Sequence, residues 1–195
     1  FPNEFSQRWL YHQCLEGLLD DDYPVPKTRL VIQNNEQSEI KLFLDKEGLE
    51  GSFITLVPGA AWSQKTWLID PYIELVDFIV NELGLSIVMI GGSDDKICSA
   101  IANHKNKQIL DLHGKLGIRQ SLAIISLGKL TVGGDTGMVH ASEALGIPVA
   151  MIMGPTNAQT GGGISLDSSV VIEKDIWCRP CSQNGKRPCY RSKQY

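Results

Sequence analysis

The segment from Lys129 to Gly163, KLTVGGDTGMVHASEALGIPVAMIMGPTNAQTGGG, constrains the fold of this chain more than any other stretch. The apolar run over residues 130–132 has the length of a strand, and two glycines then turn the chain. Asp135 or Thr136 is a natural N-cap for the helix that follows, and a glycine is placed to end that helix. Residues 147–153 read as a second buried strand, so the segment predicts a βαβ unit.

The glycine loop and helix start of this unit have the properties of an anion site. They lie at the carboxyl end of a strand, where open α/β sheets bind ligands, and they offer free N–H groups at the positive end of a helix dipole. Gly134 and Gly137 would let a ligand approach the backbone closely. A second glycine-rich loop, Gly154–Gly163, follows the next strand, which favours a site over a simple tight turn. The candidate residues here are Asp135, Thr136, Gly137 and His140.

Residues 53–153 repeat this alternation of short apolar runs and helical periods. The pattern predicts an α/β domain with a Rossmann-like, mainly parallel sheet flanked by helices. Nearer the start of the chain we expect an amphipathic helix over 1–19, a proline-containing linker, a short strand over 30–32 and a helix over 35–46, with no chemistry of their own. The five strands predicted in the domain are 53–57, 86–90, 109–112, 130–132 and 147–153.

Charge, hydrophobicity and missing motifs exclude several classes of function. The chain has 195 residues, a formal net charge of −4 and a pI near 5.6, which disfavours a general nucleic-acid binder. It has no run of transmembrane length and no signal-peptide pattern, so we expect a cytoplasmic location. It begins with Phe rather than Met, which we interpret as processing or truncation. The sequence lacks a P-loop, a Gly-x-Gly-x-x-Gly turn and a Gly-x-Ser-x-Gly elbow, so NTP hydrolysis, nicotinamide chemistry and serine hydrolysis are disfavoured.

Two loops after other strands carry polar candidates. Asp94 and Asp95 follow the strand over 86–90, where an acidic residue commonly accepts from ribose hydroxyls, but either one could instead be a helix N-cap. His113 follows the next strand and is a weaker candidate, with a surface histidine as the alternative.

The stretch GGDTGMVHASEALGIPVAMIMGPT resembles the nucleotide-sugar signature of family 9 glycosyltransferases, the lipopolysaccharide heptosyltransferases. Members carry Asp-(Thr/Ser)-Gly-x-x-His, then an apolar strand and a Gly-Pro-Thr loop. The resemblance, from about Phe53 to Cys189, implies a GT-B fold of two Rossmann-like domains, of which this chain resembles the C-terminal, donor-binding half. It implies that 1–26 is a helix and linker from a missing acceptor domain, 27–175 the nucleotide-sugar-binding domain and 176–195 a basic, cysteine-containing tail.

The resemblance also assigns residues to the donor site. Residues 65–67 match a Lys-x-Trp element of the family, whose lysine binds donor phosphate; a hydrated point cation there would neutralise the leaving diphosphate. Family members often have a hydroxyl residue where this chain has two alanines, so backbone N–H groups and Ser63 would complete the phosphate cradle. The family places its ribose-contacting acid in the loop of Asp94 and Asp95.

The implied activity is inverting transfer from ADP-heptose, or a related nucleotide sugar, to a lipopolysaccharide core acceptor, with no metal or other cofactor. The catalytic base would lie in the acceptor domain, so this chain alone would be inactive; otherwise Asp94, Asp95, Asp135 and Glu143 are the first bases to test. Peripheral contact with the cytoplasmic face of the inner membrane would follow from the acceptor. The alternatives are a non-catalytic nucleotide-binding module and a sugar-nucleotide epimerase of GT-B fold.

The end of the chain combines cysteines with positive charge. Cys178 and Cys181 have the spacing of zinc ligands and Cys189 adds a third sulfur, but no fourth Cys or His follows, so we expect free thiols or a disulfide formed on handling. From Lys174 onward there are six basic residues and one acidic residue. This bias could face an anionic lipid surface or a phosphorylated acceptor, or belong to a solvated tail.

Overall fold

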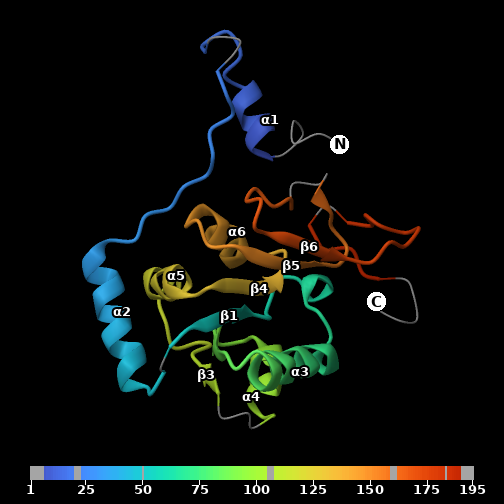
Figure 1. Cartoon of the computed structure of the whole chain (residues 1–195). Helices are drawn as coiled ribbons and strands as arrows, with labels where there is room; N and C mark the ends of the chain where they lie inside the picture. The colour runs from blue at the N-terminus through green and yellow to red at the C-terminus, as the bar shows by residue number, and fades with distance from the viewer. Residues whose placement is uncertain are drawn as a thin grey trace.

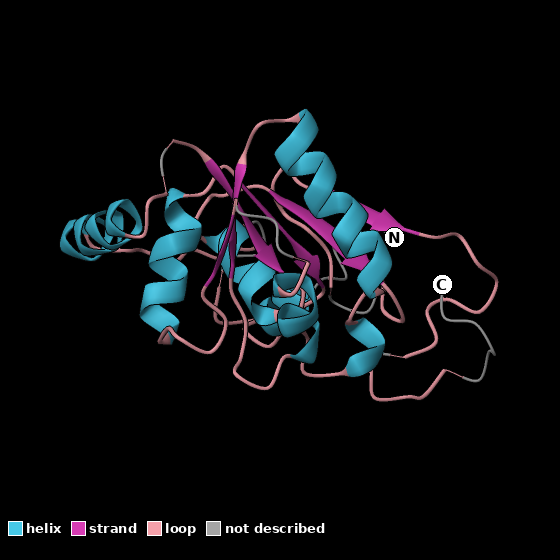
Figure 2. Ribbon diagram, turned by 90° about the horizontal axis from the view of Figure 1, so that it is seen from below, coloured by secondary structure: helices cyan, strands magenta, loops and turns pink. Residues whose placement is uncertain are grey.

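The computed structural model describes residues 7–19, 23–49, 51–104, 108–158, 162–182 and 184–189. Its body is a three-layer arrangement in which helices cover both faces of one parallel sheet (Figures 1 and 2). The segment that carries α1 (Gln7–Gln13) extends away from this body and joins it through α2 (Asn34–Lys46) (Figure 1). Within the described residues, no helix combines the length and the apolar character needed to cross a bilayer.

The sheet has the strand order β3-β2-β1-β4-β5-β6, and every neighbouring pair is parallel. The chain therefore winds outward first on one side of β1 and then on the other, and the reversal lies between β1 and β4, where Val57 pairs with Gly133. The expected Rossmann-like parallel sheet is confirmed. Its strands are β1 (Phe53–Val57), β2 (Ser86–Met89), β3 (Ile109–Asp111), β4 (Leu130–Gly134), β5 (Val149–Met153) and β6 (Val170–Glu173).

Helices α2, α5 and α6 pack on one face of the sheet, and α3, η3 and α4 pack on the other. The remaining helical elements are η2, a 3-10 turn (Ser63–Lys65), α3 (Ile69–Asp77), η3, a π-helical turn (Phe78–Glu82), α4 (Lys96–Ala102), α5 (Ile118–Leu127) and α6 (Gly137–Ala144). Helix α3 begins at Ile69, which leaves Pro71 in its first turn, where the missing N–H of the proline costs nothing.

The central strand β1 separates two apolar cores. Phe53 and Val57 belong to the core beneath α2, α5 and α6, whereas Ile54 and Leu56 belong to the core beneath α3 and α4. All five residues of β1 are buried, and Leu56 is 0% exposed. A strand covered on both faces needs apolar side chains at consecutive positions, which is why its sequence, FITLV, shows no polar alternation.

One predicted strand was wrong, and one strand of the sheet was not predicted. The predicted strand over 30–32 is an extended segment outside the sheet; it has one backbone hydrogen bond to α6, from the Leu30 N–H to the Ala144 carbonyl, and Val31 is 61% exposed. Conversely, β6 pairs with β5 but was not predicted, because half-exposed residues such as Val170 and Ile172 give an edge strand a weak pattern. Of the predicted 1–19 helix, residues 1–6 lie outside the described residues, and turns follow α1.

The contact between β1 and β4 at the reversal depends on Gly133. A Cβ at this position would lie much closer to the Val57 carbonyl oxygen than van der Waals contact allows, and that oxygen is fixed in the neighbouring strand. We therefore expect Gly133→Ala to lower the free energy of unfolding by about 1–3 kcal/mol, the usual cost of overpacking. Urea denaturation of the wild type and the variant measures this loss in the free energy of unfolding. The control is Gly137→Ala, where a Cβ would meet nothing within 4 Å; equal losses in both variants would contradict the role of the strand contact.

Candidate functional site

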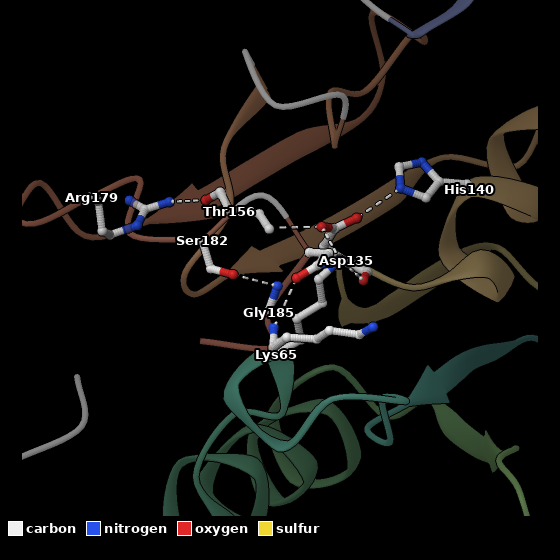
Figure 3. Close-up of polar contacts among 9 residues, drawn as sticks. Lys65, Asp135, His140, Thr156, Arg179, Ser182 and Gly185 are labelled. Carbon is white, nitrogen blue, oxygen red and sulfur yellow. Dashed lines mark hydrogen bonds and ion pairs between the residues drawn. The ribbon is translucent and has the colours of Figure 1, made fainter. Parts of the chain in front are cut away.

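The connections that follow β1, β4 and β5 meet at the carboxylate of Asp135, which is 7% exposed (Figure 3). Lys65 Nζ donates to Oδ2 at 2.6 Å and the Thr156 hydroxyl donates to the same oxygen at 2.8 Å. His140 Nε2 lies 2.9 Å from Oδ1, and it must be the protonated nitrogen because an ionised carboxylate only accepts. Lys65 Nζ also donates to the backbone carbonyl of Asp135 at 3.2 Å. We call these four residues, Lys65, Asp135, His140 and Thr156, the Asp135 cluster.

Two glycines allow the β1–α3 loop to lie against the strand ends. A Cβ at Gly134 would be 2.6 Å from the carbonyl oxygen of Lys65, and a Cβ at Gly154 would be 2.9 Å from that of Gln64. The sequence suggested that Gly134 makes room for a ligand. The structure shows that it makes room for the loop that carries Lys65.

The electrostatics of the cluster favour an ionised carboxylate. Burial on its own would raise the pKa of Asp135, but the hydrogen bonds from His140, Lys65 and Thr156 outweigh it and hold the pKa well below the usual range. The Lys65–Asp135 ion pair is itself largely buried, with side-chain exposures of 16% and 8%. The cluster therefore keeps the carboxylate of Asp135 ionised across the physiological pH range.

The start of α6 lies directly beside this pair. Thr136 takes the N-cap position, as predicted, but its side chain makes no capping hydrogen bond, and its hydroxyl is buried without a partner among the described residues. The next residue, Gly137, is exposed, with open space where a Cβ would be. A buried hydroxyl without a partner, the unpaired N–H groups of a helix start and open space above them suit an anion.

The other candidates are more dispersed. Ser63 is exposed in η2 and makes no contact with the Asp135 carboxylate in the described structure, and Asp94 is exposed in a turn. Asp95 occupies the N-cap position of α4 but caps nothing; its carboxylate accepts from the Gly92 N–H at 2.7 Å and lies tightly over Gly59. Of the two acids, Asp95 is thus the one placed over the ends of β1 and β2.

His113 and Glu143 are both held in local hydrogen bonds. His113 Nδ1 lies 2.6 Å from Asp111 Oδ1, and its Nε2 lies 3.3 Å from the Ser99 hydroxyl. Glu143 is buried, and its carboxylate accepts from the backbone N–H groups of residues 165–166 at 2.9–3.0 Å. Glu143 therefore anchors a loop and is a poor candidate for a base.

Sequence reasoning missed two polar residues of the site. The Gly-Pro-Thr loop was recognised as a motif, but nothing in the sequence indicated that the Thr156 hydroxyl turns toward Asp135. Arg179 was counted only as a tail charge, whereas its guanidinium donates to the carbonyls of Gly154 (Nε, 2.6 Å) and Thr156 (Nη2, 2.8 Å). Both contacts depend on how the side chains are oriented between loops, which the order of residue types along the chain does not show.

The tail, which we define as residues 174–182 and 184–189, folds back over the strand ends and forms one wall of an open pocket of about 380 Å³ beside Lys65. The five cysteines are free thiols, and among the described residues no three His, Cys, Asp or Glu side chains are grouped to hold a metal ion. The pocket lining includes Lys65, Trp67, Ile152, Pro155, Ile172, Cys178, Arg179, Cys181 and Cys189.

Removing the charge of Asp135 tests the electrostatics of the cluster. We expect Asp135→Asn to lower the free energy of unfolding at pH 7 by about 2–4 kcal/mol, because Lys65 loses its buried counter-ion. Because the folded pKa is depressed, the wild-type advantage is complete above the unfolded pKa of about 3.9 and shrinks as the pH falls toward the folded value. Denaturation of both proteins at pH 7 and at about pH 3 measures this; a difference that is independent of pH would contradict it.

Comparison with known proteins agrees with this architecture. The model of glycosyltransferase family 9 (heptosyltransferase) matches residues 6–190. Lipooligosaccharide heptosyltransferase 2 of Haemophilus influenzae is 25% identical over 160 residues, which cover 77% of this chain and 46% of that protein. Lipopolysaccharide heptosyltransferase 2 of Escherichia coli is 27% identical over 128 residues, covering 63% of this chain and 36% of that protein. The chain thus corresponds to less than half the length of these relatives.

Solved structures show the same fold. A family 9 glycosyl transferase from Veillonella parvula superposes with a TM-score of 0.75 at 21% identity, covering 86% of this chain and 49% of that one. The E. coli ADP-heptose lps heptosyltransferase II gives a TM-score of 0.68 at 24% identity, covering 79% and 47%. These neighbours are GT-B-type glycosyltransferases, so the predicted fold class is confirmed. With the family model matching nearly the whole sequence, the chain belongs to glycosyltransferase family 9, the heptosyltransferase family.

Proposed function

We propose that this chain is the donor-binding part of a glycosyltransferase that uses ADP-heptose, or a closely related nucleotide sugar, for transfer to a sugar of the lipopolysaccharide core. The observation that carries the proposal is the Asp135 cluster beside the open start of α6. The names of the relatives support the substrate class: they are lipopolysaccharide heptosyltransferases, and one solved neighbour is described as E. coli heptosyltransferase WaaC with ADP.

The diphosphate of the donor would bind between Lys65 and the start of α6. An ammonium group has three N–H donors, and Lys65 directs two contacts at Asp135, so one donor remains for a phosphate oxygen. The N–H groups of the first turn of α6 and the Thr136 hydroxyl would bind the other oxygens, and Gly137 leaves the approach open. We propose that the hydroxyl of Ser63, which is exposed in η2, completes this cradle when the donor binds.

These groups would also assist bond cleavage. When the sugar leaves the donor, negative charge develops on the departing diphosphate, and a fixed cation and a helix N-terminus stabilise that charge more than they stabilise the intact donor. Asp135 holds the cation in place, and His140 braces Asp135 from α6. Because protein groups supply this counter-charge, we propose that transfer requires no resident metal or other cofactor.

The nucleoside would extend from the phosphates toward β2. The Asp95 carboxylate lies over the ends of β1 and β2, where a ribose hydroxyl could donate to it in place of the Gly92 N–H. Asp94 in the same turn is exposed and is the second candidate. We assign the remaining steps, acceptor binding and proton removal, to a part of the enzyme outside these 195 residues, and we place the acceptor reaction at the cytoplasmic face of the inner membrane.

The first test concerns Lys65. We expect Lys65→Ala to weaken ADP binding by about ten- to a hundredfold, the range for one charge-assisted hydrogen bond to a phosphate. Isothermal titration calorimetry measures the dissociation constant, and Lys129→Ala, which removes an exposed lysine from the opposite end of β4, is the control. An unchanged dissociation constant in Lys65→Ala would remove Lys65 from the proposed phosphate site.

The second test separates donor binding from turnover. We expect the 195-residue chain to bind ADP or an ADP-sugar but to transfer no radiolabelled sugar to a lipopolysaccharide acceptor, because the base must be positioned across a cleft. Acceptor-dependent product from this chain alone would contradict that expectation. Product without acceptor would favour an epimerase, and binding without turnover in any longer form of the protein would favour a non-catalytic module.

A further inference from the structure

The tail holds three consecutive carbonyl groups of the loop that presents Thr156. Arg179 donates to the carbonyls of Gly154 and Thr156, and the N–H groups of Cys181 and Ser182 donate to the carbonyl of Pro155 at 3.1 and 3.2 Å. The Arg179 side chain is only 10% exposed, and it also donates to the Lys174 carbonyl at 2.8 Å and to the Glu173 carboxylate at 2.9 Å. The guanidinium therefore links the ends of β5 and β6, with its position set by four partners (Figure 3 shows its bond to Thr156).

A turn of the tail also lies on the stem of Lys65. The Gly185 N–H donates to the Ser182 hydroxyl at 2.9 Å, and Gly185 is buried with a φ of +81°. A Cβ at this position would be 2.8 Å from Cγ of Lys65 and 3.2 Å from its Cε. The next residue, Lys186, places its ammonium 4.8 Å from the centre of the Trp62 ring, so the turn is attached to the same β1–α3 loop at a second point.

We propose that Gly185 and Arg179 are positioning residues of the donor-phosphate site: Gly185 holds the Lys65 stem so that its ammonium stays on Asp135, and Arg179 holds Thr156 on the same carboxylate. The role of the aimed ammonium in donor binding rests on the proposed function. The contacts themselves do not.

The physical reason for such a device lies in the lysine side chain. Its four-carbon stem has many rotamers, and an ammonium that samples several of them would lose part of its interaction with a bound phosphate. Packing the stem between a glycine turn and the strand ends removes that freedom before the ligand arrives. Only glycine fits, because any side chain would occupy the space of the stem and because the left-handed φ strains other residues.

A double-mutant cycle tests Gly185. We expect Gly185→Ala to raise the dissociation constant for ADP by about tenfold, since the new methyl group displaces the Lys65 stem from its bonded position. In the Lys65→Ala background the stem is absent, and the same change should cost less than about twofold. Gly48→Ala is the matched control, because Gly48 has a φ of +78° and no atom within 4 Å of its Cβ position. An equal loss in both Lys65 backgrounds, or in Gly48→Ala, would overturn the proposal.

A measurement without ligand separates this inference from the proposed function. The Lys65 ammonium can be observed by ¹H–¹⁵N NMR and assigned by its loss in Lys65→Ala. We expect its resonance to persist in the wild type and in Gly48→Ala, and to shift or broaden in Gly185→Ala. If the wild type failed to bind ADP, the proposed function would fail, while a shifted resonance in Gly185→Ala would still support positioning. An unchanged resonance would overturn it.

Arg179 is tested in the same way through Thr156. Arg179→Lys keeps the charge but cannot reach both carbonyls, and we expect about three- to tenfold weaker ADP binding that largely disappears in the Thr156→Val background. Arg119→Lys is the control, since Arg119 likewise contacts a glutamate and a backbone carbonyl, Glu36 and Val31, but between α2 and α5. An effect of Arg179→Lys that is the same with and without the Thr156 hydroxyl would overturn its part in the proposal.

Discussion

The buried carboxylate of Asp135 is the constraint around which the strand ends are arranged. A carboxylate removed from water is costly unless its oxygens accept hydrogen bonds, and a buried charge also needs a counter-ion. Asp135 obtains both from three different segments: Lys65 from the β1–α3 loop, His140 from α6 and Thr156 from the loop after β5. One acid therefore ties together the connections that follow three strands of the sheet. These connections also form the surface that is open to a ligand. The hydrogen bonds that stabilise the buried Asp135 carboxylate therefore also fix the loops that surround the site.

The parallel sheet makes this convergence feasible. All carboxyl ends of parallel strands lie on one edge, and the reversal of strand order between β1 and β4 leaves their loops free to diverge above it. Glycines at the ends of β4 and β5 then let the Lys65 loop cross close to the backbone, and the tail covers it from the other side. The tail is rich in positively charged residues, yet it is part of the packing around the site. The Arg179 guanidinium donates to backbone carbonyls, and the Lys186 ammonium lies over the Trp62 ring.

Features that depend on a short stretch of sequence were predictable, and features that depend on pairing with a distant segment were not. Buried strands such as Phe53–Val57 consist of consecutive apolar residues, which predict burial on both faces. The glycines and cap residues around Asp135 likewise predict the βαβ unit. The extended segment at 30–32 has the same kind of short apolar run, but it has no neighbouring strand in the described part of the chain. Strand β6 has a neighbour, but its apolar run is only half-buried. A segment forms a strand only where another strand lies beside it, and the tertiary fold decides whether one does.

The sequence by itself determined the fold class, the family signature and the residue types of the site, because these depend on periodicity and on motifs within about thirty residues of each other. The family resemblance also assigned Lys65, Asp135 and His140 to one site, and the structure brings these three side chains together. Only the tertiary structure decided what each side chain does there. Asp95, and not Asp94, reaches the glycine ends of β1 and β2, Glu143 anchors a loop, and Gly134 admits a loop and not a ligand. These outcomes depend on distances of a few ångströms between segments separated by 20 to 120 residues, which side-chain packing sets and local sequence does not encode.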